Sequence, residues 1–339
     1  MRAGARLALA CLLALPVLTS ALPLISTTTF LVEFLGQGRW RPLSALTREP
    51  IAHPLPVADA AAGPVAIDLY VAPALRRPPG LVLVHGLSRD GKDDARLREA
   101  AALLARAGWA VAVPTVSGLT VLRLRPEDSA AVGASVRALR AAGYSRVALL
   151  GVSLGAGPAL LAGADPKVAG SVSAVLALGG YASAVELLRY TLTGAYALGE
   201  LSGRAPVQEA AIAQFARANA ELLDAAGRRL VDNRDPAAFG RLVDALPGPT
   251  RDLLDALSPG RVLGGLRAPL FLIHGRQDAA VPFTESLRLQ AAARAAGRPV
   301  RTAIVGAVGH VEAGRRAGGL ADLVRLWATF YAFRRAAGG

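Results

Sequence analysis

The stretch Arg146-Val-Ala-Leu-Leu-Gly-Val-Ser-Leu-Gly-Ala-Gly-Pro-Ala-Leu-Leu-Ala162 decides the fold. An apolar, strand-like run comes before the five residues Gly151–Gly155, and a helix-like run comes after them. This order predicts a strand, a sharp G-x-S-x-G turn and a helix, with the hydroxyl of Ser153 held away from the sheet. Glycine is expected on both sides of Ser153, because larger side chains would collide with the neighbouring strand and helix.

Two further polar residues follow strands downstream of this turn. The apolar run Ala268–Ile273 leads into His-Gly-Arg-Gln-Asp-Ala-Ala-Val-Pro, which contains Asp278, and the run Val300–Val305 leads to His310. Because ligand sites gather at the carboxyl ends of parallel strands, we expect Asp278 and His310 to lie at the same sheet edge as Ser153. The chain order of these residues is that of nucleophile, acid and base.

This arrangement resembles the α/β-hydrolase superfamily, and His-Gly-x-x-Asp-x-x-Val-Pro is one of its more specific signatures. The resemblance covers roughly residues 65–339, apart from a helical insertion. It implies that Asp278 orients His310 and that His310 takes the proton from Ser153 as the serine attacks an acyl carbon.

The resemblance also implies an oxyanion hole made of two backbone N–H groups. One belongs to Leu154, directly after the serine. The other is placed at Leu87, in the His-Gly-Leu-Ser loop that follows the strand Gly80–Val84. Gly86 lets this loop turn closely.

The same loop begins a competing pattern, because residues 86–92 match G-x-x-x-x-G-K after a strand. A phosphate-binding loop requires Ser or Thr next, but Asp93 and Asp94 follow, and two carboxylates at a helix N-terminus would repel phosphates. We therefore expect one of them to cap the helix Ala95–Arg106 and Lys92 to be solvated. His85 and His274 end strands before glycine, which favours buried structural roles.

Composition excludes several other classes of function. The net charge of +13 comes almost wholly from scattered arginines, without blocks or interleaved aromatic residues, so no nucleic-acid partner is expected. Four dispersed histidines and the single Cys11 do not supply a standard zinc site, so no metal or other cofactor is expected. A hydrophobic content of 53% is ample for a sizeable core.

The N-terminus predicts membrane attachment. The stretch Leu7–Val32 follows Arg2 and Arg6 and has no charged residue until Glu33, which is 32 − 7 + 1 = 26 residues, enough to span a bilayer. Pro16 and Pro23 interrupt it, so a cleaved signal peptide ending near Ala21 and a buried apolar segment are alternatives. The arginine distribution favours a catalytic domain outside the cytoplasm, with an exported, soluble enzyme as the alternative.

Strands and helices alternate along the rest of the chain, which predicts a doubly wound, mostly parallel α/β sheet. We expect a signal anchor or signal peptide over residues 1–32, a linker that partly packs over 33–64, and a core formed by 65–180 and 262–339. The alternation stops over 181–261, which resembles the helical cap inserted after the sixth strand in many α/β-hydrolases. Such a cap would roof Ser153; the alternative is a helical layer that does not touch substrate.

These features together predict a serine hydrolase that cleaves a small-molecule carboxylic ester through an acyl-enzyme. Two alternatives stay open. One is an amidase or peptidase that uses the same three residues, and the other is a non-catalytic, membrane-anchored binding protein of the same fold. Acyl length and leaving group do not follow from the sequence.

Overall fold

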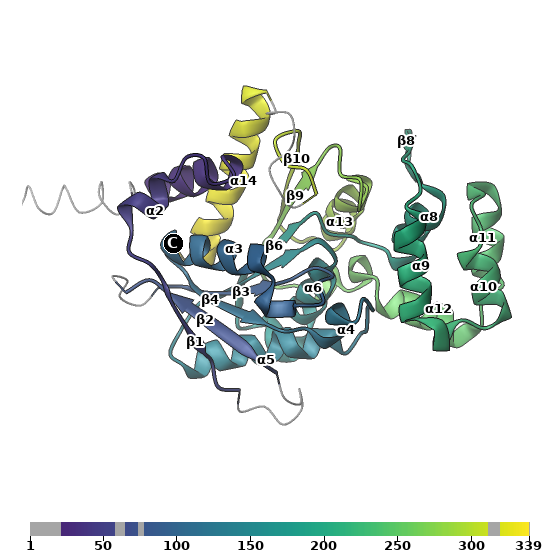
Figure 1. Ribbon diagram of the computed structural model, residues 1–339, viewed down its shortest axis with the longest axis horizontal. Coiled ribbons are helices and arrows are strands. Elements are labelled where there is room, and N and C mark those ends of the chain that lie inside the picture. Colours follow the sequence, from purple (N-terminus) through teal and green to yellow (C-terminus); the bar gives the residue numbers. More distant parts are fainter. Residues whose placement is uncertain (1–21, 58–64, 74–77, 311–318, 339) are drawn as a thin grey trace, which may run out of the picture.

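The computed structural model describes residues 22–57, 65–73, 78–310 and 319–338. Its centre is an eight-stranded sheet with the strand order β1-β2-β4-β3-β5-β6-β9-β10 (Figure 1). β2 pairs antiparallel with both of its neighbours, β1 and β4, and all other pairs are parallel. The strands are β1 (Ile51–Pro54), β2 (Ile67–Val71), β3 (Gly80–Val84), β4 (Ala110–Pro114), β5 (Val147–Val152), β6 (Val172–Leu178), β9 (Leu270–Gly275) and β10 (Val300–Val305). The predicted mostly parallel α/β sheet is confirmed.

Both faces of the sheet are covered, which is why its central strands are apolar at nearly every position. Leu149 in β5 points into a cluster with α5 (Asp128–Ala141), α6 (Ala156–Ala164) and α13 (Thr284–Ala295). Its neighbour Leu150 points to the opposite face, into a cluster with α3 (Ala95–Arg106) and α14 (Leu320–Ala337). The same alternation along β3, β6 and β9 produces two cores, one on each side of the sheet.

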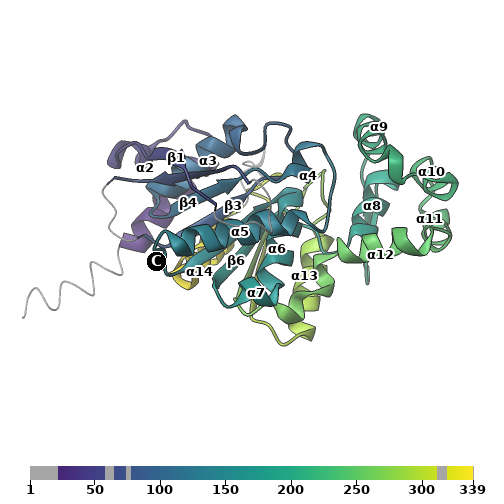
Figure 2. The same cartoon turned by 90° about the horizontal axis from the view of Figure 1, so that it is seen from below.

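The segment between β6 and β9 forms a separate helical lobe. It contains α8 (Ala184–Thr193), a hairpin of β7 (Ala195–Leu198) and β8 (Leu201–Arg204), α9 (Glu209–Ala218), α10 (Ala225–Val231), α11 (Pro236–Asp244) and α12 (Gly248–Ala256). The lobe has its own small core, formed by Leu192, Ile212, Leu230, Val231, Phe239 and Leu246. Figures 1 and 2 both show these helices projecting on the side of the molecule opposite to α14.

The two ends of this lobe are joined to each other and to the core. The Tyr181 hydroxyl donates to the Leu257 carbonyl over 3.0 Å. Glu285 of α13 accepts hydrogen bonds from the backbone N–H groups of Ala182 and Ser183, each over 2.9 Å. The chain therefore leaves and re-enters the core at one point, which fixes the lobe beside the strand ends.

The segment predicted as a linker differs from the prediction. Residues 33–64 contain α2 (Pro42–Leu46) and β1, and β1 pairs with β2, so the sheet begins at Ile51 and not at Val65. The short strand Ile-Ala-His-Pro is exposed along its length. It carries no buried alternating pattern, which is the signal that sequence reading requires.

Residues 22–35 form a helix, here called the N-terminal helix, that packs on the core. Phe30 stacks on Phe330 of α14 with ring centroids 4.7 Å apart, and both rings are buried. Glu33 is buried as well and accepts hydrogen bonds from the backbone and hydroxyl of Ser44, which ties α2 to this helix. The C-terminal part of the predicted Leu7–Val32 membrane segment is thus in contact with protein.

Residues 7–21 of that segment lie outside the described residues, as do the predicted cleavage region and Cys11. Across residues 22–57, 65–73, 78–310 and 319–338, none of the helices combines the length and the hydropathy needed to cross a bilayer. Membrane attachment and location outside the cytoplasm stay predictions.

Candidate functional site

Ser153 lies in a strained turn between β5 and α6. It is the first residue of a single 3-10 turn, Ser153–Gly155, and its backbone has φ of 55°, a left-handed conformation that serine seldom adopts. The two flanking glycines make the turn possible. A Cβ at Gly151 would lie 2.5 Å from the Ala156 Cα, and one at Gly155 would lie 2.1 Å from the His85 carbonyl oxygen.

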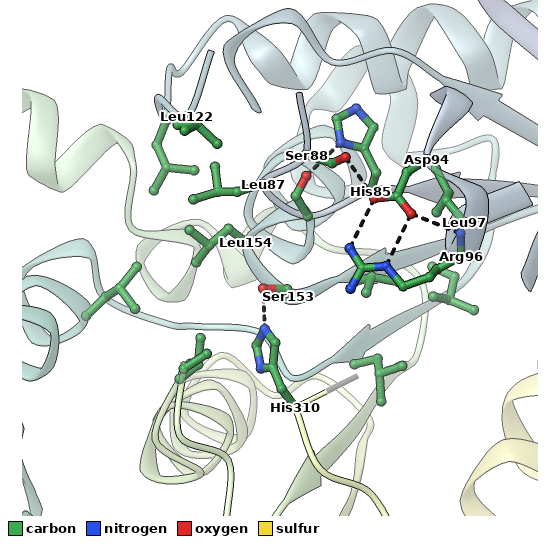
Figure 3. Close-up of a pocket in the computed structure, with 18 of the residues that line it drawn as sticks. His85, Leu87, Ser88, Asp94, Arg96, Leu97, Leu122, Ser153, Leu154 and His310 are labelled. Carbon is green, nitrogen blue, oxygen red and sulfur yellow. Dashed lines mark hydrogen bonds and ion pairs between the residues drawn. The ribbon is translucent and has the colours of Figure 1, made fainter. Parts of the chain in front are cut away.

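The structure brings Ser153, His310 and Asp278 together at the carboxyl edge of the sheet (Figure 3 shows the first two). His310 Nδ1 lies 2.6 Å from Asp278 Oδ2, and its Nε2 lies 2.6 Å from Ser153 Oγ. Because a carboxylate can only accept, Nδ1 carries the ring proton and donates it to Asp278. Nε2 then has a free lone pair that accepts the hydrogen bond from the Ser153 hydroxyl.

Asp278 is held as a carboxylate. Burial alone would raise its pKa, but hydrogen bonds from His274 and His310 outweigh burial and lower the pKa of Asp278 to about 2. Its second oxygen, Oδ1, accepts from the N–H groups of Ala280 and Val281 over 2.8 and 2.9 Å. The acid is thus fixed from both sides and charged at any physiological pH.

His274 and His85 have the structural roles that the sequence predicts. His274 is fully buried; its Nδ1 lies 2.7 Å from Ser286 Oγ, and its Nε2 lies 2.9 Å from the Val281 carbonyl and 3.3 Å from Asp278 Oδ2. His274 therefore holds the acid loop in place. His85 Nε2 accepts from the Val116 N–H over 3.0 Å, and burial lowers the pKa of this ring.

The loop after β3 approaches Ser153 closely, as an oxyanion hole requires. A Cβ on Gly86 would lie 3.0 Å from the Ser153 Cβ and 3.5 Å from its Oγ, so only glycine allows this approach without displacement. The approach brings the backbone of Leu87 near the serine. Leu154 is the second residue of the 3-10 turn before α6, where backbone N–H groups have no partner one turn earlier. The assignment of these two N–H groups to an oxyanion hole stays a prediction.

The residues of the competing phosphate-loop pattern form a helix cap and ion pairs. Asp94 is the N-cap of α3 and accepts from the Arg96 N–H over 3.0 Å. The prediction that Lys92 is solvated is wrong. Its Nζ lies 2.9 Å from the carboxylates of both Asp68 and Asp93. The Arg96 guanidinium beside Asp94 lowers the pKa of that carboxyl to about 2 (Figure 3).

A large cavity opens at Ser153. Its volume is about 1370 Å³, larger than the ~300–1000 Å³ of most small-molecule sites. Besides Ser153 and His310, it is lined mainly by apolar side chains, most of them leucine, from the core, the N-terminal helix and the helical lobe. Within the described part of the chain, no group of three or more His, Cys, Asp and Glu residues is placed to hold a metal ion.

Two glycines that sequence reasoning missed allow the acid and the histidine to meet. Gly179 follows β6 with φ of 62°, and a Cβ there would lie 2.8 Å from the His310 carbonyl oxygen and 3.4 Å from Asp278 Oδ2. A Cβ at Gly275 would lie 1.9 Å from the Gly309 carbonyl oxygen. Their positions, each just after or at the end of a strand, were visible in the sequence, but the chain segments they face were not.

No protein-family model matches the chain, and no curated protein matches its sequence. Solved structures do resemble it. A puromycin-hydrolyzing peptidase of Mycobacterium tuberculosis has a TM-score of 0.54 and 21% identity over 86% of this chain and 40% of its own. A putative dipeptidyl aminopeptidase IV of Bacteroides ovatus has a TM-score of 0.56 and 14% identity over 85% and 36%.

An acylaminoacyl peptidase of Pyrococcus horikoshii has a TM-score of 0.51 and 19% identity over 78% of this chain and 38% of its own. The chain thus spans about two fifths of the length of each of these proteins. At such identities the likeness concerns the fold alone. Together with the strand order and the strained serine turn, it shows that this chain has the α/β-hydrolase fold.

Proposed function

We propose that this protein is a serine hydrolase that cleaves carboxylic esters, with Ser153 as nucleophile, His310 as base and Asp278 as the orienting acid. The observation that carries the proposal is the unbroken chain of two 2.6 Å contacts from Ser153 Oγ through His310 to Asp278. Contacts of this length lie within the range needed for proton transfer from a nucleophile to its base.

In the proposed mechanism the Ser153 oxygen attacks the ester carbonyl carbon while its proton passes to His310 Nε2. The oxyanion that forms accepts hydrogen bonds from the N–H groups of Leu87 and Leu154. His310 then protonates the departing alcohol, which leaves an acyl group on Ser153. A water molecule, deprotonated by His310, attacks this acyl-enzyme, and the proton returns to Ser153 as the carboxylic acid departs.

The lining of the cavity favours esters over peptides. Its wall consists mostly of aliphatic and aromatic side chains, which bind apolar groups but leave the N–H and C=O groups of a peptide without partners. A peptidase remains the second candidate, because the similar solved structures include proteins described as peptidases. Those proteins have more than half of their chains outside the part matched here.

A fluorophosphonate probe, which reacts with activated serines, tests the proposal directly. We expect labelling of the wild-type protein and none of Ser153→Ala, with both proteins giving the same circular dichroism spectrum. Failure to label the folded wild type would favour the non-catalytic binding protein. A p-nitrophenyl ester and a p-nitroanilide of the same acyl group then separate the two enzyme classes, since faster anilide cleavage would favour the amidase.

A further inference from the structure

The cavity at Ser153 extends to both sides of the serine. On one side it passes under the helical lobe, where Leu154, Leu187, Leu188, Leu223, Leu253 and Leu254 line it; we call this part the cap arm. On the other it runs between the sheet and the helices that cover it, lined by Phe30, Phe34, Leu97, Ala100, Leu150 and Phe330; we call this part the N-terminal arm. Figure 3 shows Leu97 on the opposite side of Ser153 from Leu87, Leu122 and Leu154.

The N-terminal arm has apolar walls from four separate parts of the chain. Leu150 comes from β5, three residues before Ser153, and Leu97 and Ala100 come from α3. Phe330 belongs to α14, and Phe30 and Phe34 belong to the N-terminal helix. The N-terminal helix, whose sequence is part of the predicted membrane segment, therefore forms one wall of the cavity at Ser153.

The geometry around Ser153 indicates which part of an ester would enter this arm. Once the carbonyl carbon is bonded to Ser153 Oγ, its oxygen points toward the N–H groups of Leu87 and Leu154. The leaving oxygen must face His310 Nε2, which lies 2.6 Å from Ser153 Oγ. Figure 3 shows Leu97 on the side of Ser153 away from the side chains of Leu87 and Leu154, the residues of the proposed oxyanion donors, so the remaining substituent, the acyl chain, is assigned to the N-terminal arm.

We infer that this enzyme acts on esters of long, unbranched fatty acids, and that the N-terminal arm, walled by the N-terminal helix, binds their acyl chain. The inference rests on the proposed function and names its substrate class. The six residues that define the arm are apolar and suit a methylene chain, because apolar burial increases with every methylene added; Glu33 of the N-terminal helix and Arg96 and Glu99 of α3 also line the cavity. The enzyme then prefers long acyl chains over short ones if the arm extends beyond the end of a short acyl group.

A matched pair of substitutions tests the inference. Ala100→Phe places a ring in the N-terminal arm from a half-buried position on α3, and Ala211→Phe makes the same substitution at an exposed position of the cavity wall on α9 of the lobe. The assay is kcat/KM for p-nitrophenyl butanoate, octanoate and dodecanoate, measured with each purified full-length protein. Thermal unfolding of all three proteins controls for misfolding.

The wild type should prefer dodecanoate, with each methylene beyond the first few raising kcat/KM by up to roughly fourfold. Ala100→Phe should lower kcat/KM for dodecanoate by at least roughly tenfold, as expected if two or more methylenes lose their site. It should leave butanoate within about twofold of wild type. Ala211→Phe should leave the whole series within about twofold.

Each other outcome has a definite meaning. Equal losses on all three esters, or no selective loss in Ala100→Phe, would overturn the acyl assignment of this arm. A selective loss of dodecanoate in Ala211→Phe instead would place the acyl chain in the cap arm. If the wild type hydrolysed no ester, the proposed function would fail. The arm could then be tested separately by measuring how tightly Ser153→Ala binds a fluorescent long-chain fatty acid. Adding Ala100→Phe to Ser153→Ala should weaken this binding if the arm holds the acyl chain.

Discussion

The packing of the N-terminal helix can be tested with two identical substitutions on one helix. Leu31 is 7% exposed and belongs to the core cluster between the sheet, α3 and α14, whereas Leu24 is 46% exposed. Leu31→Ala and Leu24→Ala remove the same atoms and change helix propensity equally. We expect Leu31→Ala to lower the free energy of unfolding by about 2–5 kcal/mol, as buried Leu→Ala changes do. Leu24→Ala should change it by less than about 0.5 kcal/mol.

Urea denaturation of full-length protein, followed by circular dichroism, measures this difference. With a slope near 3 kcal/mol/M, a loss of 3 kcal/mol moves the midpoint by about 1 M while the slope stays constant. Phe330→Ala provides a second reading from the opposite side of the contact, because it removes the ring that stacks on Phe30, and should cost about 3–5 kcal/mol. The reasoning is refuted if Leu31→Ala and Leu24→Ala shift the midpoint equally.

Three further predictions concern the site. Asp278→Asn should lower kcat for ester hydrolysis by roughly 10³- to 10⁴-fold, because the His310 ring loses the acceptor that fixes its proton on Nδ1; full activity in this variant would move the acid elsewhere. The depressed pKa of Asp278, about 2 against an ordinary 3.8, means that its ionised form stabilises the fold by about 2 kcal/mol above pH 4. This contribution disappears as the pH falls through 2, so the stability gap between wild type and Asp278→Asn in urea should be widest near neutral pH and narrow toward pH 2, and a gap that grew on acidification would contradict the shift. Gly155→Ala should prevent formation of the serine turn and abolish probe labelling, since its Cβ would meet the His85 carbonyl oxygen at 2.1 Å; Gly240→Ala, with nothing within 4 Å of the added atom, should behave as wild type in the same labelling assay.

Much of the fold followed from local sequence. Buried parallel strands such as Val172–Leu178 are continuous apolar runs, and the turns after them contain glycine, so both kinds of element leave a strong local signal. Ser153, Asp278 and His310 could be named because each follows such a strand, and parallel strands present their carboxyl ends at one edge. Strand β1 could not be recognised, because an exposed edge strand is held by backbone pairing with β2 and needs no apolar side chain.

Contacts between segments that are distant along the chain are harder to predict from the local sequence. Gly179 and Gly275 resemble many other glycines in a chain that has 36 of them, and only the approach of the His310 loop shows why a side chain is excluded at both. Strand β7 lies in the segment predicted as a helical cap, and its residues Ala195–Leu198 continue the composition of α8, so the strand is not distinguished by its sequence. Gly194, with φ of 71°, ends that helix in a left-handed C-cap, a role that its sequence position allows but does not require.

The N-terminal helix shows why hydropathy alone is ambiguous. A bilayer interior, a protein core and a channel for an acyl chain all favour the same apolar side chains, so the run from Leu24 to Val32 fits each of them. What separates these environments is the partner. Phe30 meets the Phe330 ring at 4.7 Å, and the buried carboxylate of Glu33 meets Ser44, so this part of the helix has protein neighbours at both an apolar and a charged position. Because Phe30 also lines the cavity, a change at this residue should affect stability and long-chain hydrolysis together, whereas Ala100→Phe should affect only the latter.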